Sequence, residues 1–211
     1  MWALIGLYLS LLVTCFACGG NPRPSKFPAG TEPERTLWNV CISLGGEVEV
    51  PPDQAPYKPS SCKDPKPWKW ASLPVKVAID LEDLAPGQEF DAIDSLNNAV
   101  RTWNEWLGHE FFKVVKGDDP DLDVIVSVGA ESDYAGLAML GAYSGGQQGM
   151  VFIFAGYETD TAVYAHELGH ILGLAHDRGT KFSVMWPTAG EQIPRLTPLD
   201  RAALLWLYGL D

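Results

Sequence analysis

Three histidines and one glutamate fall within eleven residues, between His166 and His176. On an α-helix a spacing of four places His166 and His170 about one turn apart on one face, so both imidazoles can reach one ion. Glu167 is displaced around such a helix, which suits a group that takes a proton from water. Gly173 lets the chain turn back and return His176 as third ligand. The spacing predicts one zinc ion with a fourth coordination position open for chemistry.

The zinc interpretation depends on the complete pattern from His166 to His176, because the shorter His-Glu-x-x-His pattern also arises by accident on amphipathic helices. The chain has four histidines, and three of them belong to the pattern. The fourth, His109, is followed by Glu110 without a second histidine nearby. We expect His109 to be a solvated residue at a helix end.

The pattern resembles the long zinc-binding motif of the metzincin metalloproteases, which also carry a methionine turn beneath the metal. Residues 183–187, with the sequence Ser-Val-Met-Trp-Pro, are similar to that turn, and Met185 follows His176 by nine residues. This short interval resembles the matrixin-like branch more than the adamalysins. The stretch from Leu196 to Gly209 is similar to the last matrixin helix, so the resemblance covers residues 68–211.

The resemblance implies an α+β, metzincin-like fold with a twisted five-stranded mixed sheet, an active-site helix, a second packing helix and a C-terminal helix. It also implies a zinc endopeptidase in which Glu167 acts as general base and then as general acid. A peptide substrate would pair antiparallel with an edge strand upstream of the zinc helix. By position that strand includes Leu137, Ala138, Met139 and Leu140.

Two further expectations follow from the same resemblance. Asp200 would hold the methionine turn, although a simple helix cap would also explain an aspartate at this position. Matrixins place histidines near the edge strand for a second, structural zinc, and this chain has none between His109 and His166. We therefore expect one zinc ion per chain.

A different class of function remains open, in which a binding or adhesion lipoprotein keeps the fold and the zinc without turnover. The presence of Glu167 favours the peptidase, because a metal held only for structure has no use for a base beside its open position.

Composition limits the possible partners. The chain has 211 residues, 46% of them hydrophobic, which is enough for one ordinary core beside additional segments. Fifteen basic and 27 acidic residues give a formal charge of −12 without a basic run. Because nucleic-acid binding needs a basic surface, we expect no nucleic-acid partner. The resemblance implies a protein or peptide substrate, and we expect a monomer.

The N-terminus predicts export. Residues 2–17 are apolar apart from Ser10 and Thr14, which is too short for a membrane span of about 20 residues. We assign residues 1–17 to a signal peptide, although its usual basic start is missing. Ala17-Cys18-Gly19 resembles a bacterial lipoprotein cleavage site with a lipid on Cys18; simple cleavage and an uncleaved anchor are the alternatives. We expect a membrane-anchored lipoprotein or a secreted protein, with no other membrane contact.

Residues 18–67 are rich in proline and read as a tether and loop segment before the catalytic domain at 68–211. Cys41 and Cys62 remain after processing, and an exported chain would join them in a disulfide. Alternatively, Cys62 is a matrixin-type propeptide cysteine that occupies the zinc, although its neighbours do not match the Pro-Arg-Cys-Gly pattern. At the end of this segment, Trp68 and Trp70 are expected to pack on the domain.

Apolar periodicity predicts the elements that position the histidines. Strands are expected at 75–79, 111–115, 123–128, 137–140 and 150–154, the last two on either side of the glycine-rich stretch 141–149. A helix capped by Asp91 would bury Ile93, Leu96, Val100, Trp103 and Leu107. Thr159 or Asp160 would cap the zinc helix, and Thr197-Pro198 would start the last one. The acidic turn 118–123 is a calcium candidate, with a solvated turn as the favoured alternative.

Overall fold

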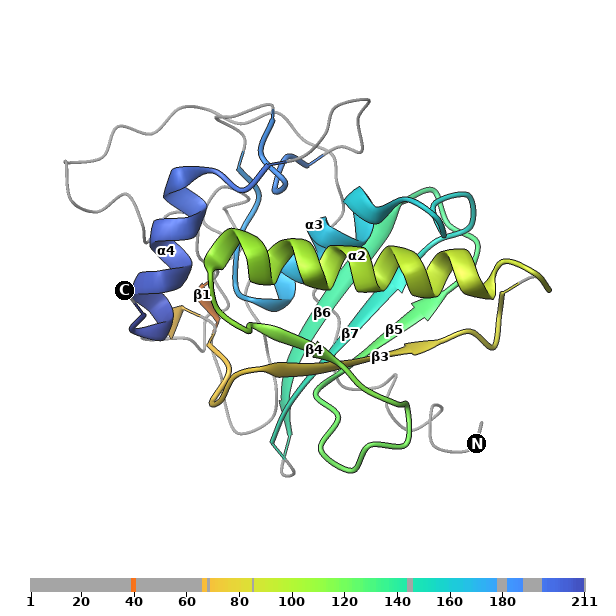
Figure 1. Cartoon of the computed structure of the whole chain (residues 1–211), viewed down its shortest axis with the longest axis horizontal. Coiled ribbons are helices and arrows are strands. Elements are labelled where there is room, and N and C mark those ends of the chain that lie inside the picture. The colour runs from red at the N-terminus through yellow and green to blue at the C-terminus, as the bar shows by residue number, and fades with distance from the viewer. Residues whose placement is uncertain are drawn as a thin grey trace, which may run out of the picture.

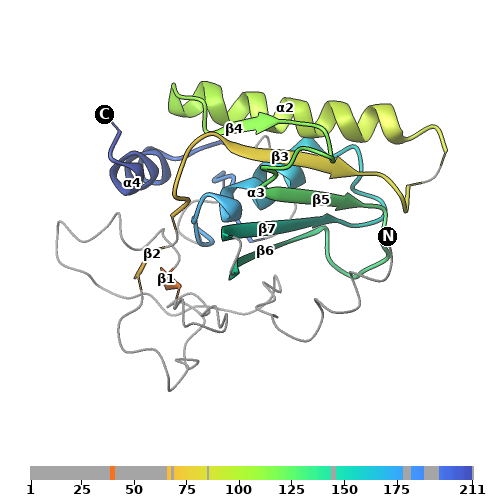
Figure 2. The same ribbon diagram turned by 90° about the horizontal axis from the view of Figure 1, so that it is seen from below.

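The fold is α+β and is built on one five-stranded mixed sheet. The computed structural model describes residues 39–40, 66–67, 69–84, 86–143, 146–177, 182–187 and 195–210. The sheet order is β4-β3-β5-β7-β6 (Figure 2). The parallel strands are β3 (Val75–Asp80), β4 (Phe112–Val114), β5 (Val124–Val128) and β7 (Gly146–Ile153), and β6 (Gly136–Tyr143) is antiparallel to β7.

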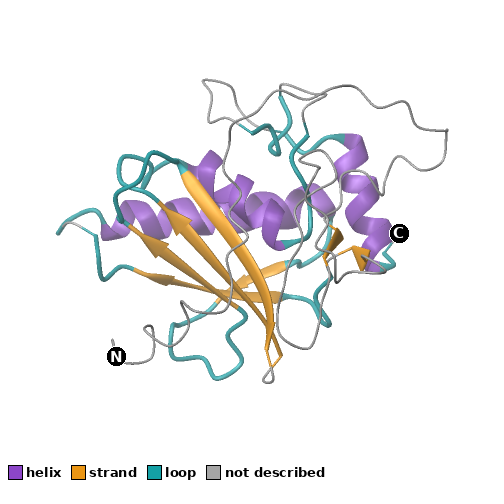
Figure 3. Ribbon diagram, turned by 180° about the vertical axis from the view of Figure 1, so that it is seen from behind, coloured by secondary structure: helices purple, strands orange, loops and turns teal. Residues whose placement is uncertain are grey.

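The described residues form three helices beside the sheet: α2 (Glu89–Leu107), α3 (Thr161–Ile171) and α4 (Pro198–Tyr208). Helices α2 and α3 lie on one face of the sheet (Figures 1 and 3). The Trp103 indole of α2 donates a 2.8 Å hydrogen bond to the Ala165 carbonyl of α3 and is fully buried. This bond fixes the zinc helix against its neighbour. None of the described helices has the length and apolar character that a membrane crossing requires.

The predicted strand at 75–79 is confirmed as β3, and most of the predicted helical stripe is buried. Leu96, Val100, Trp103 and Leu107 of α2 all lie in the core. The predicted cap Asp91 is wrong, because α2 begins at Glu89 and Asp91 lies within its first turn. The chain enters this helix earlier, where the Glu89 carboxylate accepts a 2.7 Å hydrogen bond from the Gly87 amide.

The strands predicted at 137–140 and 150–154 are longer in the structure and extend into the glycine-rich stretch 141–149. Most of it belongs to the strands of the β6–β7 hairpin, with Tyr143 paired to Gly146. Glycine is weak in strands in general, but here the continuing ladder of main-chain hydrogen bonds outweighs that preference.

A lysine of β3 pairs with two of the aspartates in the acidic turn after β4. Lys76 Nζ lies 3.2 Å from Asp119 Oδ1 and 3.2 Å from Asp121 Oδ2. The Asp123 carboxylate accepts a 2.8 Å hydrogen bond from the Lys76 amide. These contacts raise the pKa of Lys76, with the hydrogen bond to Asp121 contributing most. The ammonium group lies between two of the carboxylates that a calcium ion would use, so the turn gives calcium no support.

A short segment at residues 69–71, here called the strap, ties the start of the domain to the zinc helix. Trp70 is 2% exposed, and its indole donates a 2.7 Å hydrogen bond to the Ile171 carbonyl at the end of α3. The Gln147 amide accepts from Ala71 N and donates to Lys69 O, each at 2.6 Å. The predicted packing of Trp70 is confirmed, whereas Trp68 lies outside the described residues.

Before the strap, the described part of the chain includes only a short antiparallel pair, β1 (Asn39–Val40) with β2 (Lys66–Pro67). The predicted signal peptide, Cys18, Cys41 and Cys62 lie outside the described residues. The boundaries at 17 and 67 stay predictions.

Candidate metal centre

The predicted helix that carries His166 and His170 is confirmed as α3, with Asp160 as its cap and a turn at Gly173 after its end. The N-cap of α3 is Asp160, whose carboxylate accepts a 2.9 Å hydrogen bond from the Ala162 amide. After Ile171 the chain turns back through Gly173 at a φ of 100°, a left-handed conformation that favours glycine. This turn brings His176 back toward the helix.

The three histidines meet at their Nε2 atoms. The distance is 3.1 Å between His166 and His170, 3.3 Å between His166 and His176, and 3.2 Å between His170 and His176. They form a group that can hold a metal ion. Zinc–nitrogen bonds of 2.0–2.1 Å at tetrahedral angles separate the nitrogens by about 3.3 Å. The triangle therefore has the size that three corners of a tetrahedral zinc site require.

Two main-chain carbonyls orient these imidazoles. His166 Nδ1 lies 2.6 Å from Val184 O, and His170 Nδ1 lies 2.8 Å from Leu174 O. Because a carbonyl oxygen only accepts, both Nδ1 atoms carry the proton in the neutral rings, and both Nε2 atoms present lone pairs. Two lone pairs that face each other at 3.1 Å repel unless a cation lies between them, so the donor set fits a metal ion.

The environment also keeps these ligands neutral. Burial lowers the pKa of His166 to about 4, against the effect of its hydrogen bond to Val184. Burial and the neighbouring imidazoles hold the pKa of His170 well below its usual range. Neutral imidazole is the form that binds a metal, so neither ring has to lose a proton at neutral pH.

Glu167 is a buried carboxyl group on the same helix. It is 4% exposed, and burial raises its pKa to about 8 in the metal-free protein. Its Cγ, Cδ and Oε1 atoms pack against the first residue of β6, Gly136. The structure thus places an ionisable group with a strongly shifted pKa immediately after the first histidine of the triangle.

Residues 183–187 form a tight turn beside α3. Met185 is fully buried and packs against Gly169, where its sulfur leaves no room for a Cβ atom. The Trp186 amide donates to Ser183 O at 3.0 Å, and the Asp177 amide donates to Met185 O at 2.8 Å. The turn therefore contacts both the middle of the zinc helix and the residue after His176.

Asp200 holds this turn and also caps α4. Its Oδ2 accepts from the Ser183 hydroxyl at 3.2 Å and from the Thr197 hydroxyl at 2.7 Å. Ser183 Oγ in turn accepts from the Met185 amide at 3.0 Å. Thr197 is the N-cap of a complete capping box, as expected. The two alternatives for Asp200 are thus both correct, since one carboxylate does both.

The predicted substrate strand lies at a free edge of the sheet. Within the described residues β6 pairs with β7 alone, and Leu137, Ala138, Met139 and Leu140 all belong to it. The Phe154 amide donates to Ala135 O at 3.1 Å, which fixes the alternation of the ladder. By that alternation the main-chain groups of Gly136, Ala138 and Leu140 point outward, away from β7.

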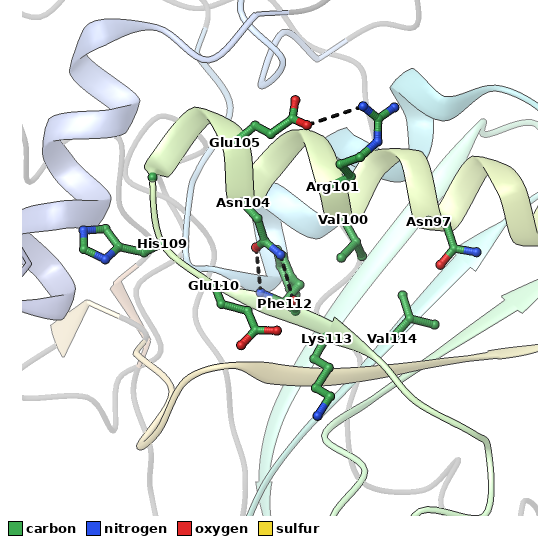
Figure 4. Close-up of a pocket in the computed structure, with 11 residues that line it drawn as sticks. Asn97, Val100, Arg101, Asn104, Glu105, His109, Glu110, Phe112, Lys113 and Val114 are labelled. Carbon is green, nitrogen blue, oxygen red and sulfur yellow. Dashed lines mark hydrogen bonds and ion pairs between the residues drawn. The ribbon is translucent and has the colours of Figure 1, made fainter.

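At the opposite edge of the sheet a side chain caps the start of β4. The Asn104 amide of α2 donates to Phe112 O at 2.9 Å and accepts from the Phe112 amide at 3.0 Å (Figure 4). It also accepts from the Phe111 amide at 2.9 Å. A shallow groove runs between α2 and β4 here, and His109 is one of its lining residues. His109 is exposed and follows the end of α2, as predicted. The groove shares no residue with the histidine triangle.

Sequence reasoning missed the contacts that cross between elements. Val184 and Leu174 orient the histidines through main-chain oxygens, so no residue type reveals them. Asn104 resembles any polar residue on a helix. Gly136 did leave a signal, because glycine at the start of an apolar strand is unusual and often marks a close approach.

Two comparisons with known proteins bear on this site. The family model described as Metallo-peptidase family M12B Reprolysin-like matches residues 76–177, a range that contains the three histidines and Glu167. A search of the curated proteins found no match to the chain. The matched model is reprolysin-like and ends before Met185, whose spacing led to the matrixin-like interpretation. The family match and the histidine group together fit a metzincin and indicate a zinc-dependent metallopeptidase.

Proposed function

We propose that the protein is an exported zinc endopeptidase in which His166, His170 and His176 hold the ion and Glu167 transfers the proton. The observation that carries the proposal is the triangle of Nε2 atoms at 3.1–3.3 Å. Three ligands leave a position open, which is typical of catalytic rather than structural zinc.

The chemistry divides between the ion and the chain. A bound zinc ion supplies Lewis acidity, which acidifies a water molecule and polarises a peptide carbonyl. Glu167 takes the proton from the attacking water and then delivers it to the leaving amine. Burial raises the pKa of Glu167 to about 8, while a nearby dication favours the carboxylate. These opposing effects leave a proton affinity suited to both transfers.

The free edge of β6 supports an extended peptide as substrate. Main-chain groups of a substrate would pair antiparallel with the outward groups of Gly136, Ala138 and Leu140. Because such pairing uses main-chain atoms, it accepts many sequences and leaves selectivity to side-chain pockets.

The same proposal includes the finer assignments for the chain. The nine-residue interval before Met185 supports a matrixin-like turn next to a domain that matches a reprolysin-like model. Val40 pairs with Lys66, which brings the two ends of the segment that contains Cys41 and Cys62 together. This pairing supports a disulfide between the two cysteines.

A lipid on Cys18 would anchor the exported protein. Mass spectrometry of the mature N-terminus and non-reducing peptide mapping test these assignments.

Two substitutions test the central proposal. Glu167→Ala should keep zinc and lose peptide hydrolysis by about 10²–10⁴-fold, because the imidazoles remain while the base is removed. His170→Ala should lose zinc and activity together. Glu110→Ala changes an exposed glutamate and serves as the matched control. The measurements are zinc content by elemental analysis and cleavage of an unfolded protein.

One outcome would contradict the peptidase proposal. If the wild-type protein contains zinc but cleaves no unfolded protein after removal of residues 18–67, the peptidase proposal fails. A biological effect that survives Glu167→Ala would then point to the binding module.

A further inference from the structure

We infer that Gly136 is a positioning residue, because its missing side chain leaves the space in which the Glu167 carboxyl group lies at the metal centre. This inference rests on the proposed function. The absence of a side chain at Gly136 creates the space in which the glutamate lies. A Cβ atom at this position would come within 2.5 Å of Glu167 Oε1, 2.8 Å of Cγ and 2.9 Å of Cδ. Real Cβ atoms essentially never approach a neighbour that closely.

Backbone conformation does not explain the glycine. Gly136 is not among the glycines with a positive φ, so any residue could adopt its backbone angles. Glycine in a strand costs stability through its extra conformational freedom and its missing packing. Its presence is therefore explained by the space that Glu167 occupies.

The inward side chains of β6 increase in size away from the glutamate. Gly136, Ala138 and Leu140 alternate toward the buried side of the strand. The smallest of the three contacts Glu167. The position without a side chain is therefore the one that faces the Glu167 carboxyl group.

Gly136 would contact both a paired substrate, through its main chain, and the Glu167 carboxyl group. Its main-chain groups face the free edge where a peptide would pair, while its Cα side faces the Glu167 carboxyl group. A methyl group here would push the carboxyl group away and leave the three imidazoles in place. A displacement of about 1 Å at a reacting group costs about 10²-fold in rate.

The experiment compares Gly136→Ala with two other glycine substitutions. Gly149→Ala adds a methyl group under the same helix, where it meets Ile171 Cδ1 at 3.0 Å and not Glu167. Gly117→Ala adds one where nothing lies within 4 Å. Each is made in the wild-type and in the Glu167→Ala background. Melting temperature, zinc affinity by chelator competition, kcat and KM are measured.

The expected result is specific for the Gly136–Glu167 pair. Gly136→Ala lowers the melting temperature by about 3–6 °C in the wild type and by much less in Glu167→Ala, where the added methyl group enters the vacated space. It lowers kcat by about 10²-fold and leaves zinc affinity and KM nearly unchanged. Gly149→Ala destabilises both backgrounds equally, and Gly117→Ala changes neither.

Two results would overturn the inference: an equal loss of melting temperature from Gly136→Ala in both backgrounds, or an unchanged kcat. The melting-temperature comparison needs no turnover and therefore separates the two proposals. If the wild type hydrolyses nothing while the coupling persists, the peptidase proposal fails and the role of Gly136 in catalysis with it, but the contact stands.

Discussion

The two edge strands of the central sheet, β4 and β6, differ in whether their outward main-chain groups are hydrogen-bonded within the described residues. At β4 the Asn104 amide makes three hydrogen bonds to the main chain of Phe111 and Phe112, and α2 lies over the strand. At β6 eight residues pair on one side with β7, and no described residue pairs with the other side. Free edges promote aggregation, so proteins usually shorten or cover them. The long edge without a described partner belongs to β6, the strand whose first residue contacts Glu167 on the histidine-bearing helix.

The largest effect should come from removing the metal, and it should fall on one edge only. We expect a chelator to abolish hydrolysis and to remove about 4 kcal/mol of stabilisation at a metal concentration 1,000-fold above Kd. Hydrogen exchange should then increase in α3 and in the adjoining β6, while α2 and β4 keep their protection. Equal increases at both edges would show that the zinc site stabilises the whole domain rather than the β6 side.

The second test places proline in the free edge. The Ala138 amide faces outward, so Ala138→Pro should remove a donor for the substrate and obstruct pairing while the ladder to β7 remains. We expect kcat/KM to fall by about 10²-fold, through the lost pairing, with bound zinc unchanged. The matched variant Met139→Pro removes a donor to β7 and should mainly lower the melting temperature. If Ala138→Pro leaves kcat/KM intact, substrate does not pair with this edge.

The third test removes the side chain that caps β4. Asn104→Ala should lower the free energy of unfolding by about 2–3 kcal/mol, because three hydrogen bonds are lost and main-chain groups are left unpaired. Activity per folded molecule should stay the same, since the site lies at the other edge. Asn97→Ala, on an exposed position of the same helix, is the control for denaturant unfolding. A large loss of kcat in Asn104→Ala would contradict the separation of the two edges.

The smallest effect concerns pH in the metal-free protein. The folded pKa of His166 is about 4, and that of His170 is also lowered, so below pH 6.5 the unfolded chain binds more protons than the folded one. Stability from these two groups therefore decreases as the pH drops below 6.5. The folded pKa of Glu167 is about 8, so stability from this group decreases as pH rises from 4.5 to 8. Because two histidines oppose one glutamate, we expect maximal stability near pH 6.5. Glu167→Gln should abolish the decrease above that pH in thermal unfolding.

The sequence predicts what depends on local spacing. The histidines at 166 and 170 follow from helical geometry, and the Thr197 cap follows from a hydroxyl, a proline and an acid in order. The capped edge depends on the Asn104 side chain reaching the main chain of Phe112, which requires the chain to turn back after α2. The wrong cap at Asp91 shows that the start of a helix also depends on the turn before it. Local propensity does not contain such contacts, because they exist only after the elements have packed.

The strap has a consequence for how the domain folds. Trp70 donates its indole hydrogen bond to Ile171, 101 residues later, and its amide lies 3.4 Å from the Tyr208 hydroxyl, 138 residues later. Tyr208 in turn donates to Leu172 O at 3.3 Å. Contacts between residues so distant in sequence slow folding, because a long loop must close before they form. The contacts of Tyr208 with Trp70 and Leu172 can therefore form only once α4 has docked against the end of α3.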